Sequence, residues 1–123
     1  MRAFRKAIIG LAGAAALTSG MTGTASAATG DGVCDSGEFC LYYGRDFTGH
    51  VFDTTASRSS YIGLSYPGTS IRLLDGVGSW WNRTDTRVEV FENSNYAGAG
   101  TLIAPGSRSV NTYRHSAASH WIG

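Results

Sequence analysis

Two segments of the chain, YYGRDFTG at 42–49 and FENSNYAG at 91–98, share one spacing of aromatic residues and glycine. Each begins with an aromatic residue, has a second aromatic residue at its sixth position and ends with glycine. In a β-hairpin the second aromatic ring folds over the turn, and the glycine leaves room for it and takes the dihedral angles that the turn needs. Two copies with identical spacing predict a structural unit that occurs twice.

The remaining residues are typical of an all-β fold. Short runs rich in aromatic and β-branched residues alternate with Gly, Asn, Asp, Ser and Pro, and helical periodicity is not found after residue 28. Each copy is followed by a Pro-Gly pair, at 67–68 or 105–106, and by an aliphatic residue. We therefore predict one all-β domain over residues 28–123, with two repeated units at about 38–81 and 87–123. Counted from hairpin glycine to Pro-Gly pair, the first unit is 11 residues longer than the second.

The first 27 residues have the features of a secretory signal peptide. Arg2, Arg5 and Lys6 precede a short apolar run, and small residues lead to a predicted cleavage site after Ala27. Because that run is too short to span a bilayer, we expect a secreted, extracellular chain of residues 28–123. This chain contains seven arginines, no lysine and nine acidic residues, for a net charge of −2. The charge argues against nucleic acid or an anionic membrane as a partner.

Cys34 and Cys40 are the only cysteines, and in a secreted chain we expect them to form a disulfide. The two hairpins resemble those of the βγ-crystallin superfamily, whose unit is a Greek key. The segments GEFCLYYGRDFTG and SWWNRT, with the short N-terminal disulfide, resemble more closely bacterial secreted peptidase inhibitors of the Streptomyces metalloproteinase inhibitor type. The resemblance implies a βγ-crystallin-like sandwich in which the units at about 38–81 and 87–123 are the two Greek-key motifs, and it implies an extracellular protease as partner. Characterised members carry a further disulfide that braces an inhibitory segment, and this chain has no cysteines left to form it.

The longer connection in the first unit is the predicted protease-contacting loop. Its extra residues fall around TTASRSSYIGL, and long surface loops often carry function. We expect residues 54–66 to form this loop on a monomeric protein. A rigid, pre-ordered loop suits inhibition, because it loses little entropy on binding. Four residues are predicted at its apex: Arg58, Ser59, Ser60 and Tyr61.

Trp80 and Trp81 form a second candidate site, an aromatic binding surface. Neighbouring residues of a strand point to opposite faces, so one ring is expected inside and the other at the surface or under the long loop. An exposed tryptophan beside Tyr61 and Tyr66 suits an interface. It also suits a different class of protein, a non-inhibitory extracellular module that is structural or stress-related, or a glycan-binding or killer-toxin-like effector.

The sequence predicts no catalytic site, since it lacks a nucleophile elbow, a zinc-protease motif and a phosphate-binding glycine loop. A degenerate version of the βγ-crystallin calcium motif occurs at 74–79, LDGVGS. Asp75 and Ser79 match this motif, whereas Leu74 and Gly78 offer no side-chain oxygen. The second copy, RHSAAS at 114–119, has a cation and a histidine at the acidic positions. We therefore expect no cofactor and no tight calcium binding.

Overall fold

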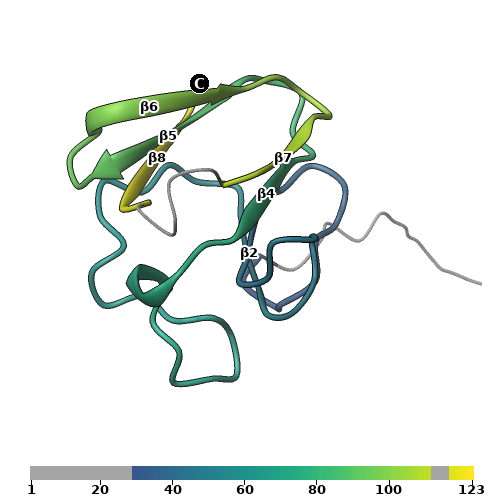
Figure 1. Cartoon of the computed structure of the whole chain (residues 1–123). Helices are drawn as coiled ribbons and strands as arrows, with labels where there is room; N and C mark the ends of the chain where they lie inside the picture. The colour runs from purple at the N-terminus through teal and green to yellow at the C-terminus, as the bar shows by residue number, and fades with distance from the viewer. Residues whose placement is uncertain (1–28, 112–116) are drawn as a thin grey trace, which may run out of the picture.

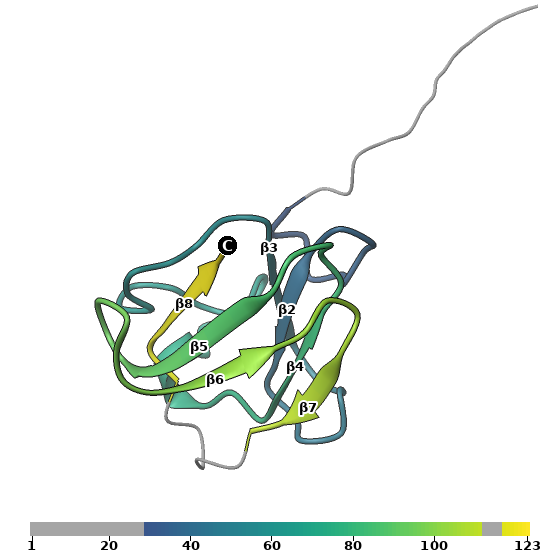
Figure 2. The ribbon, with the colours of Figure 1, turned by 90° about the horizontal axis from the view of Figure 1, so that it is seen from above.

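The computed structural model describes residues 29–111 and 117–123, so the predicted signal peptide lies outside the described residues. Two antiparallel β-sheets pack face to face (Figures 1 and 2). In spatial order, the first sheet contains β3 (Val51–Thr54), β2 (Phe39–Tyr42), β4 (Ser79–Asn82) and β7 (Arg108–Val110). The second sheet contains β6 (Ala97–Ile103), β5 (Val88–Asn93) and β8 (Ser119–Ile122). One turn of 3₁₀ helix, η1 (Leu73–Asp75), precedes β4, and the predicted all-β class is confirmed.

The two units interlock through β7. This strand follows β6 in the chain, but it leaves the second sheet and pairs with β4 of the first, where Trp81 lies opposite Arg108. The crossing strand makes the two sheets one Greek-key sandwich with a shared core. The predicted sandwich of two Greek-key motifs is therefore confirmed.

Both aromatic–glycine hairpins have the predicted conformation. Phe47 packs edge-to-face on Tyr42, with ring centroids 6.0 Å apart, and Tyr96 packs on Phe91 at 5.9 Å. The glycines that end the two segments have φ of +82° and +83°. These are left-handed backbone values that glycine adopts without a Cβ penalty, which explains the strict position of glycine in both copies.

A serine from a later strand closes each hairpin. Ser79 Oγ donates to the carbonyl of Gly44 at 2.7 Å and accepts the N–H of Phe47 at 3.1 Å. Ser119 Oγ makes the same pair of bonds in the second hairpin, at 2.6 and 3.1 Å. Each serine thus satisfies two backbone groups that the folded turn leaves without a strand partner.

The core lies between the sheets and extends beneath the long connection from β3 to β4. Phe39, Leu41 and Trp80 come from the first sheet, and Val88 and Val90 come from the second. The connection adds three side chains with no exposed surface: Tyr61, Tyr66 and Leu73. The long connection is therefore a structural part of this small domain.

Part of this connection takes the place of a fourth strand on the second sheet. Arg58 pairs with His120 of β8 through two backbone hydrogen bonds of 2.9 Å. On the first sheet, β7 occupies the corresponding position beside β4. Pro105-Gly106 comes just before β7, whereas Pro67-Gly68 comes nine positions after Arg58.

The two Pro-Gly pairs are therefore not equivalent, and their predicted correspondence is wrong. The extra length of the first unit lies after Arg58: Ser79 follows Arg58 by 21 positions, whereas Ser119 follows Ser109 by 10. Pro-Gly is the signature of a local turn, and it carries no information about where that turn falls within the Greek key.

Candidate functional site

Residues 59–78 connect Arg58 to β4 and are 11 residues longer than the corresponding stretch of the second unit, 110–118, so we call them the added segment. Tyr61 anchors its beginning. The Tyr61 side chain is fully buried, and its hydroxyl lies 2.7 Å from Nδ1 of His120. The other ring nitrogen, Nε2, lies 2.8 Å from the carbonyl of Ala56, so Nε2 carries the proton and Nδ1 accepts from the tyrosine. Tyr61 also donates its backbone N–H to Ala118.

The predicted apex of the loop is not an apex. Of its four residues, Ser59 is exposed, Arg58 and Ser60 are half-buried and Tyr61 is fully buried. The Ser59 carbonyl accepts the N–H of Asn95 at 2.6 Å, and Ser60 Oγ lies 3.2 Å from Ser94 Oγ. This segment therefore lies along the second sheet, because β8 provides an open strand edge and the Tyr61 ring is buried beside the ring of His120.

One residue further on, the segment makes a tight turn whose Ile62 and Gly63 are exposed. Leu64 donates its N–H to the carbonyl of Tyr61 at 3.0 Å, and Gly63 has φ of +84°. Ile62 at the corner of this turn is 71% exposed, the largest exposure among the large hydrophobic side chains that the structure describes. An apolar side chain held this far out of the core is available for contact with another molecule.

A small hairpin follows, and we call residues 65–72 the projecting hairpin. Ser65 and Arg72 pair as a β-bridge, and Tyr66 donates its N–H to Ile71 at 2.9 Å. At the tip, Thr69 donates to the carbonyl of Tyr66 at 3.1 Å across Pro67-Gly68, with Gly68 at φ +76°. In Figure 1 the teal connection before β4 extends away from both sheets.

The projecting hairpin has a buried base and an exposed tip. The Tyr66 ring is fully buried, its hydroxyl donates to the carbonyl of Gly76 at 2.6 Å, and burial raises the pKa of this phenol. Leu73 is also fully buried, and its N–H donates to Leu64 at 2.9 Å. Gly68 and Ser70 at the tip are exposed. The hairpin is therefore fixed on both sides without a disulfide.

The tryptophans occupy three different environments. Trp80 is 2% exposed and belongs to the core, while Trp81 is half-buried beneath the guanidinium groups of Arg83 and Arg108. Opposite faces for the two neighbours were predicted, and this is confirmed. Tyr61 and Tyr66 are both buried, so the predicted surface that combined them with an exposed tryptophan is wrong.

The exposed tryptophan is Trp121, which sequence reasoning did not single out. It is 52% exposed and packs edge-to-face on Tyr96, with ring centroids 5.2 Å apart. The alternation of β8 contained the signal, because Trp121 follows Ser119 just as Trp81 follows Ser79. Once the two serines are recognised as equivalent, Trp121 falls on the outer face.

The oxygens of the degenerate calcium motif have other partners. Asp75 forms an ion pair with Arg72 at 2.7 Å, and hydrogen bonds from Arg72 lower the pKa of this carboxyl group. Ser79 Oγ is used in the first hairpin. A Cβ at Gly78 would lie 2.6 Å from the backbone of Gly44, so this position has no room for a serine or threonine ligand. Within the described ranges, no three His, Cys, Asp or Glu residues are grouped to hold a metal ion.

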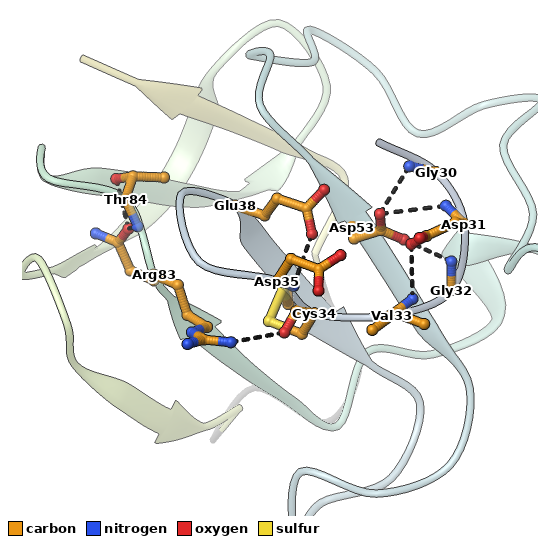
Figure 3. Close-up of a disulfide and its surroundings, with 12 residues drawn as sticks. Gly30, Asp31, Gly32, Val33, Cys34, Asp35, Glu38, Asp53, Arg83 and Thr84 are labelled. Carbon is orange, nitrogen blue, oxygen red and sulfur yellow. Dashed lines mark hydrogen bonds between the residues drawn. A yellow bond between two sulfur atoms is a disulfide. The ribbon is translucent and has the colours of Figure 1, made fainter. Parts of the chain in front are cut away.

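The N-terminal segment is tied to the first sheet at two points (Figure 3). The predicted disulfide between Cys34 and Cys40 is present. The buried carboxylate of Asp53 accepts the N–H groups of Gly30 at 2.7 Å and Gly32 at 2.8 Å. Together these contacts hold the start of the domain against β2 and β3.

Two buried titratable groups act in opposite directions on the pH dependence of stability. Burial lowers the pKa of His120 from 6.5 to about 4, so its stabilising contribution is present above pH 6.5 and is lost as the pH falls through about 4. Burial raises the pKa of Glu38 from 4.5 to about 6, so its contribution is present below pH 4.5 and is lost as the pH rises through about 6. Between pH 4.5 and about 6, the two effects on the free energy of unfolding offset each other.

Replacing either group is expected to reveal the other. From pH 4.5 to about 6, the free energy of unfolding of Glu38→Gln, relative to wild type, should rise by about 1 kcal/mol per pH unit. His120→Asn should show a slope of opposite sign over the same range. Urea unfolding at four pH values measures both slopes. Parallel pH profiles for all three proteins would contradict the assignment.

The fold and the anchored loop define the class: a βγ-crystallin-type sandwich with an added exposed segment. A profile of the peptidase inhibitor family I36 matches residues 27–103, and the chain belongs to that family. This membership confirms the predicted resemblance and the assignment as a non-enzymatic protein.

The structural comparison supports the same fold. A solved structure titled "Evolution of the eye lens beta-gamma-crystallin domain fold" is similar, with a TM-score of 0.59 and 14% identity, over 82% of this chain and 93% of that one. At this identity the likeness concerns the fold alone. No curated protein matches the sequence. In the part of the chain that the structure describes, no helix is long and apolar enough to cross a membrane.

Proposed function

We propose that this protein is a secreted peptidase inhibitor that contacts its target protease through the projecting hairpin and the neighbouring Ile62-Gly63 turn. This replaces Arg58–Tyr61 as the contact segment, because those residues lie along the second sheet. The proposal rests on family membership and on one structural observation: the added segment has a buried base and an exposed tip.

The buried base explains how a loop without its own disulfide could inhibit. A flexible loop loses conformational entropy on binding and is cleaved readily, whereas a pre-ordered loop loses little. Here the buried rings of Tyr61 and Tyr66 and the side chain of Leu73 hold the backbone at both ends. These three anchors take the bracing role that the missing second disulfide has in characterised relatives.

A bulky residue at the hairpin tip tests the contact. Ser70→Trp should weaken inhibition of the target protease by about tenfold or more, because the added ring blocks close approach to the cleft. The matched control is Ser107→Trp, which adds the same ring at an exposed residue of the other Pro-Gly turn, where Ser107 donates to Ala104 at 3.0 Å. This control should inhibit within about twofold of wild type.

Inhibition constants against a thermolysin-like zinc protease and a subtilisin-like serine protease provide the measurement. Equal inhibition by both tryptophan variants would place the contact elsewhere on the molecule. The proposed function itself would be contradicted if wild-type protein, in molar excess over the protease, is digested and slows the activity of neither protease.

The alternative of a glycan-binding module loses the surface on which it was predicted. Trp80 is in the core and the ring of Trp81 is covered by two arginines, so neither ring is free to stack on a sugar. The structural and family observations therefore favour inhibition.

A further inference from the structure

Arginine and aromatic side chains alternate on the outer face of the first sheet. The guanidinium carbon of Arg83 lies 4.7 Å from the ring centroid of Trp81, and that of Arg108 lies 5.3 Å from the same ring. Arg108 also lies over Phe47, at 4.8 Å. We call these four residues the arginine ladder.

The fold brings the arginine ladder together from three parts of the chain. Trp81 on β4 and Arg108 on β7 are cross-strand partners, which exist only because β7 crosses to the first sheet. Arg83 follows Trp81 by two positions and donates to the carbonyl of Cys34 at 2.7 Å (Figure 3). Phe47 is the ring folded over the first hairpin. The disulfide segment, the hairpin and the crossing strand thus all hold guanidinium groups in place.

Neither arginine of the ladder forms an ion pair with a carboxylate of the described residues. Among residues 29–111 and 117–123, Arg72–Asp75 is the one ion pair between arginine and a carboxylate. The guanidinium of Arg108 is stacked on aromatic rings and makes no hydrogen bond with any described residue, and Arg108 is exposed. Burial raises the pKa of Tyr42 while Arg83 and Arg108 act to lower it, which puts both cations within electrostatic reach of one phenol.

A stacked, pre-ordered guanidinium presents paired N–H donors in one plane, the geometry that a carboxylate accepts in bidentate form. Two such groups beside one indole suit a ligand that carries neighbouring carboxylates. An acidic sugar chain would find no free aromatic face to stack on at this site, because guanidinium groups lie over the Trp81 ring. An acidic peptide needs no such face, since its carboxylates extend on flexible side chains.

We propose that the arginine ladder is a binding site for an acidic peptide segment of a protein partner, with its carboxylates held by Arg83 and Arg108. The site lies on the first sheet and does not depend on the projecting hairpin. It can therefore bind whether or not the protein inhibits a protease.

Calorimetry with N-acetyl-hexaglutamate amide at about 0.05 M salt tests the proposal, since higher salt screens exposed charges. Wild type should bind one peptide, and Arg83→Gln and Arg108→Gln should each raise the Kd by about tenfold. Arg108→Lys keeps the charge without the planar guanidinium, so its Kd should lie between those of wild type and Arg108→Gln. The control Arg87→Gln removes an exposed arginine outside the ladder and should change the Kd by less than about twofold.

One further readout separates specific binding from general charge attraction, and another checks folding. The indole N–H resonance of Trp81, assigned through Trp81→Phe, should shift on titration with the peptide. The thermal midpoints of the glutamine variants should show that these variants are folded. The proposal is overturned if Arg87→Gln weakens binding as much as Arg108→Gln does. It is also overturned if polygalacturonate or inorganic phosphate binds more tightly than hexaglutamate, which would assign the site to another anion.

Discussion

Trp80→Ala is expected to lower the free energy of unfolding by about 3–5 kcal/mol, a large part of the stability of a domain of this size. Trp80 is 2% exposed and is the largest of the fully buried side chains. Its ring packs in the cluster that joins both sheets to Tyr61 and Tyr66 of the long connection. Removing it leaves a cavity where the two sheets and the added segment meet. Urea unfolding followed by far-ultraviolet circular dichroism measures the loss.

Trp121→Ala is the matched control, because it removes an equally large ring that is 52% exposed. We expect this change to cost less than about 1 kcal/mol. If Trp80→Ala does not fold, Trp80→Phe provides the measurement. It should cost about 1–2 kcal/mol, since it keeps most of the volume and removes an indole N–H that lacks a partner among the described residues. Equal losses at Trp80 and Trp121 would contradict the described core.

Gly78→Ala is expected to cost about 3 kcal/mol, the second-largest effect of a single substitution. An ideal Cβ at Gly78 would lie 2.6 Å from the carbonyl carbon of Gly44 and 2.7 Å from the carbonyl oxygen of Tyr43. Both neighbours are backbone atoms, so the first hairpin itself must move. That movement would also disturb the 2.8 Å hydrogen bond from Gly78 to Tyr42.

Gly63→Ala separates this steric effect from the general cost of replacing glycine. Nothing lies within 4 Å of a Cβ at Gly63, although its φ of +84° is unfavourable for alanine. We expect a loss of about 1 kcal/mol there. A smaller loss at Gly78 than at Gly63 would show that the approach of β4 to the first hairpin is not tight. The midpoint of thermal unfolding is a sufficient measurement for both variants.

The extent to which the sequence predicts the candidate site depends on how far apart the interacting residues lie. The first hairpin is predictable because the turn, the aromatic pair and the glycine fall within eight residues. The buried position of Tyr61 is not predictable, since its hydroxyl partner His120 is 59 positions away in the chain. A polar stretch such as SRSSY looks like an exposed tip until the open edge of β8 is known.

The same limit explains the tryptophans. Alternation along a strand predicts that Trp80 and Trp81 face opposite ways. It does not predict that Arg108 comes from another unit to cover Trp81, because that contact depends on β7 crossing between sheets. Alternation also places Trp121 on an outer face, but it does not predict that Trp121 stays exposed while Trp81 is covered.

The sequence by itself determined the all-β class, the two hairpins and the disulfide between Cys34 and Cys40. Each of these rests on residues close together in the chain, where backbone geometry restricts the choice of amino acid. The tertiary structure alone decided that Arg58–Tyr61 lies along β8, that the projecting hairpin is the exposed part of the added segment, and that two arginines share one indole. These features depend on packing between segments far apart in the chain, and local sequence patterns carry no record of such contacts.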